Sequence, residues 1–382
     1  MTSTFGKFRY LNPSTIYYGH GCVRQIDKSL QQRQTTRVHI VSTRSLIGSK
    51  AMDYLRHEST LLQSARVSTI AAHVPLEELL EITREIRETG ADAVVALGGG
   101  SPIDAAKLAS YGATSAEITT ASLSDFKAIL ATQSSRGSLP TFCVPTTLAA
   151  AELYAAAGFT DDVTGQKDGG YHPTMTPQAV FYDPAVSSET PPDLWTTTGV
   201  RALDHATETL LAPTVDPISE VLATSAIVDL FDLLPRYAAD PTSTSIRLQC
   251  HLAAWKSYTL PTVAATGLSH TLGKAVGAKN NIPHGVTSCV ILPQVLTYYA
   301  QTPAMRTRID HVAGELGLEP APEGGCSLAD AVEHLVDGLG LPTKFTRTEL
   351  SEVDQLEAAT RTAEQRGIPV ETVRGILSAC IA

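Results

Sequence analysis

Residues 98–107 read GGGSPIDAAK, and this stretch decides the fold. The apolar run 93–97 leads into it, and a helix-forming run, 105–109, leads out of it. A strand, a glycine turn and a helix start, in this order, let backbone N–H groups close around a phosphate, because glycine permits close approach and positive φ. The stretch therefore predicts a cradle for the pyrophosphate of a dinucleotide. A tight turn without a ligand is the alternative.

Three residues after the glycines predict where the helix starts. Ser101 is a favoured N-cap, Pro102 fits the first helical position, and Asp104 lies three residues after the cap, as in a capping box. The dipole of such a helix places partial positive charge at the glycines. We therefore expect the helix to begin just after Ser101.

Length, charge and cysteine usage limit the class of protein. The chain has 382 residues, which predicts two domains, and 43% of them are apolar. Its formal net charge of −10 argues against nucleic acid and anionic membranes as partners, so a small molecule is the expected partner. The six cysteines are scattered without a CxxC pair, and no apolar leader or membrane-length apolar run occurs. We expect reduced thiols and a cytoplasmic location.

The N-terminal half alternates strand and helix patterns. Most of residues 1–35 read as irregular, and an amphipathic helix is predicted at 75–89. Predicted strands are 15–18, 38–41, 93–97, 140–144 and 179–182. This alternation implies a mostly parallel sheet with helices on both faces, and ligands bind at the carboxyl ends of such strands.

The C-terminal half reads as helical throughout. Strand patterns end near residue 185, and Gly317 and Gly367 are predicted helix stops. Predicted helices are 194–211, 217–236, 244–259, 262–278, 286–301, 303–316, 327–338 and 348–366. The fold class is therefore a Rossmann-like α/β dinucleotide-binding domain, residues 1–186, followed by an all-helical substrate domain, residues 187–382. We expect the active site in the cleft between them.

Five polar residues of the helical half are candidates for chemistry. Arg201 and His205 lie four residues apart and share one face of a helix, as do His270 and Lys274. His284 follows in a turn, in the segment IPHG. A single histidine in such a helix is more often structural than functional, so the five gain weight only when they are taken together with the glycine turn.

Taken together, these features resemble the iron-containing (group III) alcohol dehydrogenase family, and within it the maleylacetate reductase branch. The resemblance covers nearly the whole chain and implies that family's fold, which is also that of dehydroquinate synthase. The matching motifs are GGGSxxDxxK at 98–107, PTT at 145–147 with Glu152 after a short run, YDP at 182–184, ATE at 206–208, and GxxH at 267–270 with His284 fourteen residues later.

The resemblance also bears on metal binding. Metal-dependent members hold iron or zinc with an Asp, a His four residues later, and two His fourteen residues apart. Here Arg201 stands at the Asp position and Lys274 replaces a further family His, so His205, His270 and His284 are the ligands if an ion binds. Arginine has no lone pair, and a divalent ion about 4 Å from it would be repelled by roughly 8 kcal/mol at an effective dielectric of about 20. We therefore expect no metal.

These residues predict an NAD(P)H-dependent reductase. Arg201 would polarise a carbonyl or bind a carboxylate, and a histidine or Lys274 would supply a proton. Two cations in one pocket predict a small anionic carbonyl or enone substrate. The alternatives are a metal-dependent alcohol dehydrogenase, an imine reductase in a biosynthetic pathway, and a non-redox lyase, cyclase or nucleotide-binding module. A further alternative is that Arg201 pairs with a nearby carboxylate and the pocket has lost its function.

The resemblance extends to the cofactor and the assembly. The loop after the 38–41 strand has no acidic residue, so Arg44 can reach a 2′-phosphate; this allows NADPH or NADH, with NADPH slightly favoured. A homodimer is expected, as for relatives. The expected cofactor-binding residues are Thr43, Arg44, Gly98, Gly99, Gly100, Ser101, Asp104, Thr146, Thr147 and Lys167.

Overall fold

The computed structural model describes residues 15–114, 137–162, 165, 167–258, 267–280, 282–322 and 324–382. The described chain divides into two compact units. The sheet unit contains residues 15–190 and 242–251, and the helical unit contains residues 191–241 and 252–382. Among the described helices, none has the length and apolar character needed to cross a bilayer.

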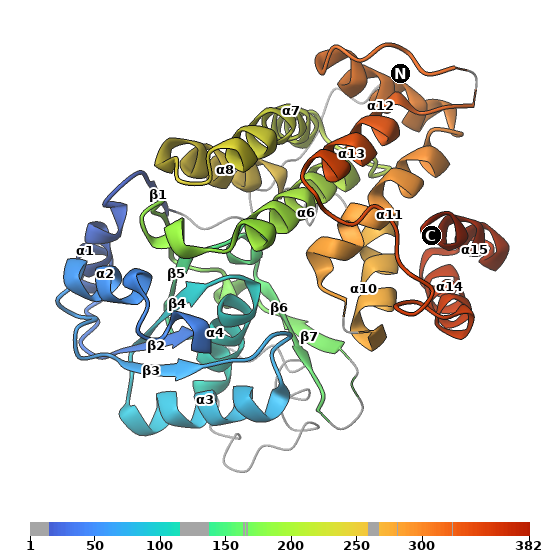
Figure 1. The fold of residues 1–382 in the computed structure, drawn as a ribbon. Helices are drawn as coiled ribbons and strands as arrows, with labels where there is room; N and C mark the ends of the chain where they lie inside the picture. The colour runs from blue at the N-terminus through green and yellow to red at the C-terminus, as the bar shows by residue number, and fades with distance from the viewer. Residues whose placement is uncertain are drawn as a thin grey trace. The chain divides into compact units, whose positions relative to one another are not determined.

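The sheet unit is built on six parallel strands (Figure 1). Their order across the sheet is β1 (Thr15–Tyr18), β8 (Ala179–Tyr182), β5 (Thr141–Pro145), β4 (Ala93–Gly98), β2 (Val38–Ser42) and β3 (Arg66–Thr69). Every residue of β4 and β5 is buried. Strands covered on both faces need apolar residues at successive positions, which explains the unbroken run 93–97.

Helices cover both faces of this sheet. Val95, Phe142 and Phe181 point to one face and pack with buried residues of the first two helices, while α4 contacts the sheet at β2, β4 and β5. The helical segments are η1 (Cys22–Gln25), α1 (Ile26–Gln31), η2 (Arg44–Leu46), α2 (Lys50–Glu58), α3 (Leu76–Thr89), α4 (Gly100–Ala113), η3 (Ala151–Leu153), η4 (Pro173–Met175) and η5 (Val186–Glu189). A separate antiparallel hairpin consists of β6 (Ala156–Thr160) and β7 (Lys167–Tyr171).

The five predicted strands and the helix at 75–89 are confirmed, but several elements were not predicted, among them α2 and β6. Residues 22–31 are helical rather than irregular. Strand β3 lies at the sheet edge, where a polar sequence suffices because one side is uncovered. Strand β7 reads KDGGY, which lacks the β-branched residues that mark a strand, and it is held by pairing with β6.

The start of α4 differs from the prediction. The helix begins at Gly100 with Gly99 as its cap, so Ser101 is not the N-cap and there is no capping box. The chain turns earlier because Gly98 adopts φ of 140°, a conformation that glycine tolerates and other residues rarely adopt. The side chains of Ser101 and Asp104 are thereby freed from capping, and both contact other segments of the sheet unit.

The helical unit confirms the all-helical prediction, with local differences. Its helices are α6 (Pro192–Leu210), α7 (Pro217–Ala239), the end of α8 (Thr244–Ser257), α10 (Leu268–Asn280), α11 (His284–Tyr299), α12 (Pro303–Glu315), α13 (Ser327–Gly338), α14 (Glu352–Arg366) and α15 (Val370–Ala379). Residues 262–266, where a helix was predicted to start, lie outside the described residues, and the last helix was not predicted. Gly317 and Gly367 follow helix ends with positive φ, as predicted.

Candidate functional site

The glycine turn is packed closely against the end of β5. A Cβ on Gly98 would lie 2.6 Å from Cγ of Pro102, and a Cβ on Gly99 would lie 3.0 Å from two side-chain atoms of Thr147. The amide of Thr146 donates to the carbonyl of Gly98 at 3.0 Å. The predicted cofactor residues of these two loops are therefore brought together at the carboxyl edge of the sheet, where first-turn helix amides have no acceptor within the helix.

Two further predicted cofactor residues, Ser101 and Lys167, both contact His73. Nothing in the sequence indicated His73. The amide of His73 donates to Oγ of Ser101 at 3.1 Å, and Nδ1 of His73 lies 3.2 Å from Nζ of Lys167. Burial and the neighbouring ammonium lower the pKa of His73, so a neutral ring accepts the lysine proton. His73 and Val74 have φ of 68° and 56°, and no sequence pattern predicts such strained backbone in these residue types.

The remaining predicted cofactor residues differ in their surroundings. Thr43 follows β2, with its hydroxyl 3.1 Å from that of Ser45, and Arg44 is exposed beside it. Asp104 points to the hairpin instead: it accepts from the amide of Gly158 at 3.3 Å and pairs with Lys107 at 3.0 Å. Arg44 is thus exposed at the end of β2, whereas Asp104 contacts the protein's own hairpin.

A single added methyl group tests the cradle. Gly100 has ordinary helical backbone, and a Cβ there would meet nothing closer than 3.9 Å. We expect Gly100→Ala to keep the thermal midpoint but to weaken NAD(P)H binding by about tenfold or more, because the methyl would occupy the path of the phosphate. Fluorescence titration measures this, with Gly375→Ala, which also meets open space, as the control. Unchanged affinity of Gly100→Ala would mean that no phosphate binds there.

A buried carboxyl group lies behind the cradle in the sheet unit. Glu152 is 2% exposed and accepts from the hydroxyl of Tyr182 at 2.9 Å. Burial raises its pKa from 4.5 to about 7, although that hydrogen bond and the charge of Lys107 act in the opposite direction. The carboxyl group is therefore protonated in the folded protein under mildly acidic conditions.

From the raised pKa of Glu152 we expect the free energy of unfolding to fall as the pH rises. Between 4.5 and about 7 the folded state holds a proton that the unfolded state has released, so the stability falls with rising pH. Up to about 3 kcal/mol is lost across this range. We expect Glu152→Gln, which cannot ionise, to abolish that loss. Urea unfolding at about pH 5 and about pH 8 measures this change for the wild-type protein and the variant. An equal change of unfolding free energy with pH in both would contradict the raised pKa of Glu152.

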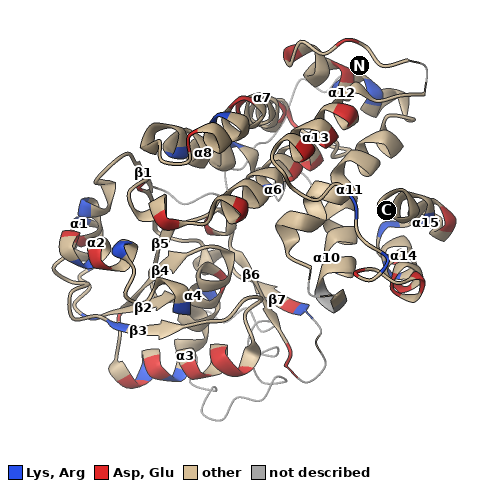
Figure 2. Cartoon of the chain, viewed as in Figure 1, with Lys and Arg blue, Asp and Glu red and all other residues tan. Residues whose placement is uncertain are grey.

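In the helical unit, α6 carries a buried ion pair. Arg201 is 9% exposed, and its Nη1 lies 3.3 Å from Oδ2 of Asp204 and 3.0 Å from Oγ of Ser288. The hydroxyl of Ser288 donates to the same Asp204 oxygen at 2.7 Å. Ser288 comes from α11, which has no Asp, Glu, Lys or Arg along its length (Figure 2). Arg201 therefore pairs with a carboxylate from its own helix.

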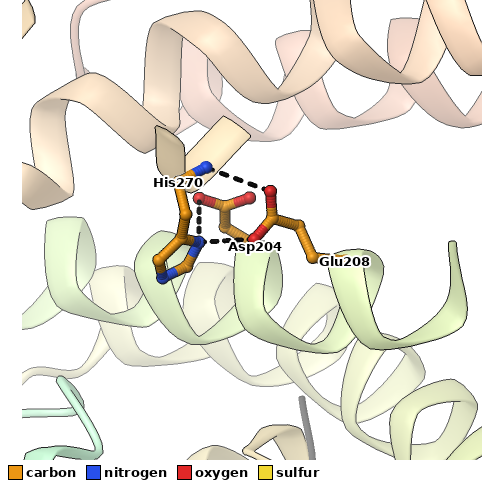
Figure 3. A group of neighbouring side chains, drawn as sticks. All are labelled: Asp204, Glu208 and His270. Atoms are coloured by element: carbon orange, nitrogen blue, oxygen red, sulfur yellow. Dashed lines mark hydrogen bonds and ion pairs between the residues drawn. The ribbon is translucent and has the colours of Figure 1, made fainter. Parts of the chain in front are cut away.

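A second carboxylate of α6 holds the start of α10 (Figure 3). Glu208 accepts from the amides of Gly267 at 3.1 Å and His270 at 3.0 Å, and its Oε2 lies 2.6 Å from Nδ1 of His270. A Cβ on Gly267 would overlap the Glu208 carboxyl, which explains a glycine there. One carboxylate thus fixes both the backbone and the ring of His270.

The charges in this cluster are strongly perturbed by burial. Burial raises the pKa of Asp204 and of Glu208, and it holds the pKa of His270 and of His205 well below the usual range. Because burial holds the pKa of His270 well below its usual range, its ring is neutral and does not add a full charge beside Glu208.

The other predicted site residues lie on α6, α10 and α11. The His205 ring lies 4.8 Å from that of His270 and 4.7 Å from that of Tyr258. Lys274 lies one turn beyond His270 and is exposed. His284 is the first residue of α11 rather than part of a turn, because Pro283 before it caps the helix. Asp204 was missed, and Glu208 was noted only as part of a motif.

The comparisons place the chain in a family. Residues 13–184 match the model "Iron-containing alcohol dehydrogenase", and residues 195–375 match "Fe-containing alcohol dehydrogenase family, C-terminal". Dehydrogenase ALT3 of Alternaria alternata is 31% identical over 360 residues, which cover 86% of this chain and 92% of that protein. The chain belongs to the iron-containing alcohol dehydrogenase family. It is therefore an NAD(P)-dependent oxidoreductase, as the sequence predicted.

Relatives of this family member include both reductases and alcohol dehydrogenases. Maleylacetate reductase 1 of Cupriavidus pinatubonensis is 30% identical, over 65% of this chain and 63% of that protein. The sulfoacetaldehyde reductase of Bifidobacterium kashiwanohense, solved with NAD⁺, shares the fold with a TM-score of 0.82 at 21% identity, covering 98% of this chain and 99% of that one.

The family name implies iron, so the side chains must be tested against an ion. Among the described residues, Asp204, Glu208 and His270 have donor atoms within 4.8 Å of one another, and the three predicted histidines do not form such a group. However, Oδ2 of Asp204 already contacts Arg201 and Ser288, and Nδ1 of His270 already lies 2.6 Å from Oε2 of Glu208. The donors are matched to one another, and a guanidinium lies where it would repel a cation.

Proposed function

We propose that this family member is an NAD(P)H-dependent reductase of a small anionic carbonyl or enone substrate, similar to maleylacetate, and that it works without a metal ion. The observation that carries the proposal is the buried guanidinium of Arg201. Its hydrogen bonds in the described chain all use Nη1, so the edge formed by Nε and Nη2 remains for a ligand. That edge matches the two oxygens of a carboxylate, or it can polarise a carbonyl.

The cofactor residues fit a dinucleotide because a Cβ would fill the glycine cradle at Gly98 and Gly99. When bound there, the nicotinamide supplies hydride. Arg44 is exposed at the end of β2 without an acidic neighbour in its loop, which supports NADPH at least as well as NADH.

Besides the hydride, the reduction needs a proton for the substrate. His270 is the candidate group for proton transfer that is best fixed by its surroundings, because Glu208 contacts its backbone amide and its Nδ1; burial keeps the ring neutral, so it would relay a proton rather than store one. A ring whose Nδ1 faces a carboxylate presents Nε2 for proton transfer. Lys274 is exposed one turn away and remains the alternative.

The absence of a metal requirement rests on charge. Arg201 forms an ion pair with Asp204, and Nδ1 of His270 faces the Glu208 carboxyl group. A divalent ion would have to break these contacts while lying near the guanidinium, at a cost of several kcal/mol. The metal-dependent alcohol dehydrogenase that the sequence left open is the rival here.

A substrate panel tests the proposal. NADPH and NADH oxidation would be followed with maleylacetate, its dimethyl ester, an uncharged aliphatic aldehyde and a cyclic imine. We expect kcat/KM for maleylacetate to exceed that for the ester by about 100-fold, the value of one charge-assisted bidentate contact. Faster turnover of the ester or the aldehyde would overturn the anionic-substrate proposal. Preferred reduction of the imine would favour the biosynthetic alternative.

A further inference from the structure

The environment of Arg201 requires an internal counter-charge. The side chain is buried on α6, and the neighbouring α11 contributes no charged residue. An isolated buried guanidinium costs several kcal/mol, so it needs a carboxylate within contact distance. Asp204, which is fully buried one turn further along the same helix, supplies it at 3.3 Å.

The contact orients the guanidinium as well as neutralising it. Asp204 and Ser288 both bind the single atom Nη1, and the Ser288 hydroxyl links the two by donating to Asp204. The three bonds form a closed triangle that fixes one corner of a planar group. With Nη1 held, the Nε–Nη2 edge has one direction only, and a planar donor pair binds a carboxylate well only when its direction is set beforehand.

We propose that Asp204 is a positioning residue for substrate binding, acting through Arg201 with Ser288 as its bridge. The inference rests on the proposed function, because a held guanidinium matters only if it meets an anionic substrate. It assigns a role to a residue that is not among the histidines expected to hold an ion, and it is a role other than metal binding. The role differs from simple stabilisation, because it concerns the ratio of rates between charged and uncharged substrates.

The test compares that ratio across matched variants. Asp204→Asn keeps the shape of the side chain and removes its charge, whereas Ser288→Ala removes only the bridge. The control is Asp193→Asn, the same change at an exposed position in the first turn of the same helix. For each protein, kcat and KM would be measured with maleylacetate and with its dimethyl ester, together with the thermal midpoint.

We expect Asp204→Asn to lower the maleylacetate-to-ester ratio of kcat/KM by about tenfold and Ser288→Ala by about threefold, with no change in the control. A lower thermal midpoint with the ratio preserved in both variants would show a merely structural role and overturn the inference alone. If the wild-type protein itself shows no preference for the anion, the proposed function fails and the inference fails with it. Should Asp204→Asn not fold, an unchanged ratio in Ser288→Ala overturns the inference.

Discussion

Arg201→Met is expected to lower kcat/KM for maleylacetate by about 10²–10³-fold, because it removes the pair of N–H donors that binds the substrate. Methionine roughly keeps the length of the side chain. It also strands the buried Asp204 carboxylate, so a stability loss of about 3–5 kcal/mol is expected alongside. Steady-state kinetics and urea unfolding measure the two effects separately.

Two further variants separate these effects. Arg201→Lys retains the charge opposite Asp204 but loses the planar edge, so we expect most of the stability to return while the rate stays low. Arg236→Met is the matched control, because Arg236 pairs with Asp232 at 2.6 Å on α7 with both side chains half-exposed. Wild-type kinetics in Arg201→Met at full folding would contradict the role of Arg201.

Glu208→Ala is expected to destabilise the protein by about 3–5 kcal/mol. Its carboxylate accepts from two amides and faces one ring nitrogen, and all three donors lie at the start of α10. Removing this carboxyl group therefore leaves several buried polar groups at the start of α10 without an acceptor. Urea unfolding measures the loss.

Glu208→Gln removes the charge of this side chain but keeps one oxygen that can accept a hydrogen bond. Its amide oxygen can still accept from the backbone of α10, so we expect about half of the stability to be retained. The control is Glu364→Ala, at an exposed position of α14, which should change the stability by less than about 0.5 kcal/mol. Equal losses in Glu208→Ala and Glu364→Ala would show that the carboxylate does not hold α10.

The central strands of the sheet could be predicted from the sequence, because burial on both faces requires runs of consecutive apolar residues. The apolar run of β4 and the glycines after it locate the central strand and the ligand edge without tertiary information. Strand β3 and the hairpin could not be found in this way, because their residues are polar or glycine and their strand state depends on pairing.

The candidate site was predictable only in part. Helical spacing placed Arg201 and His205 on α6, but spacing does not indicate which carboxylate meets which cation. Asp204 and Ser288 are 84 residues apart in sequence, and their contact follows from the packing of α11 on α6. Arg201 does pair with a nearby carboxylate, as one alternative expected, but that alternative also held that the pocket has lost its function, and this second part stays untested.

The measurement that tests the central claim most directly is metal content together with activity. The protein would be purified, treated with a strong chelator, analysed for iron and zinc, and assayed for NAD(P)H-dependent reduction of maleylacetate. We expect full activity with far less than one ion per chain, because the Nε–Nη2 edge of Arg201 already supplies the donors that bind and polarise the substrate. One tightly held iron or zinc per chain, with activity lost on chelation and restored by that metal alone, would contradict it.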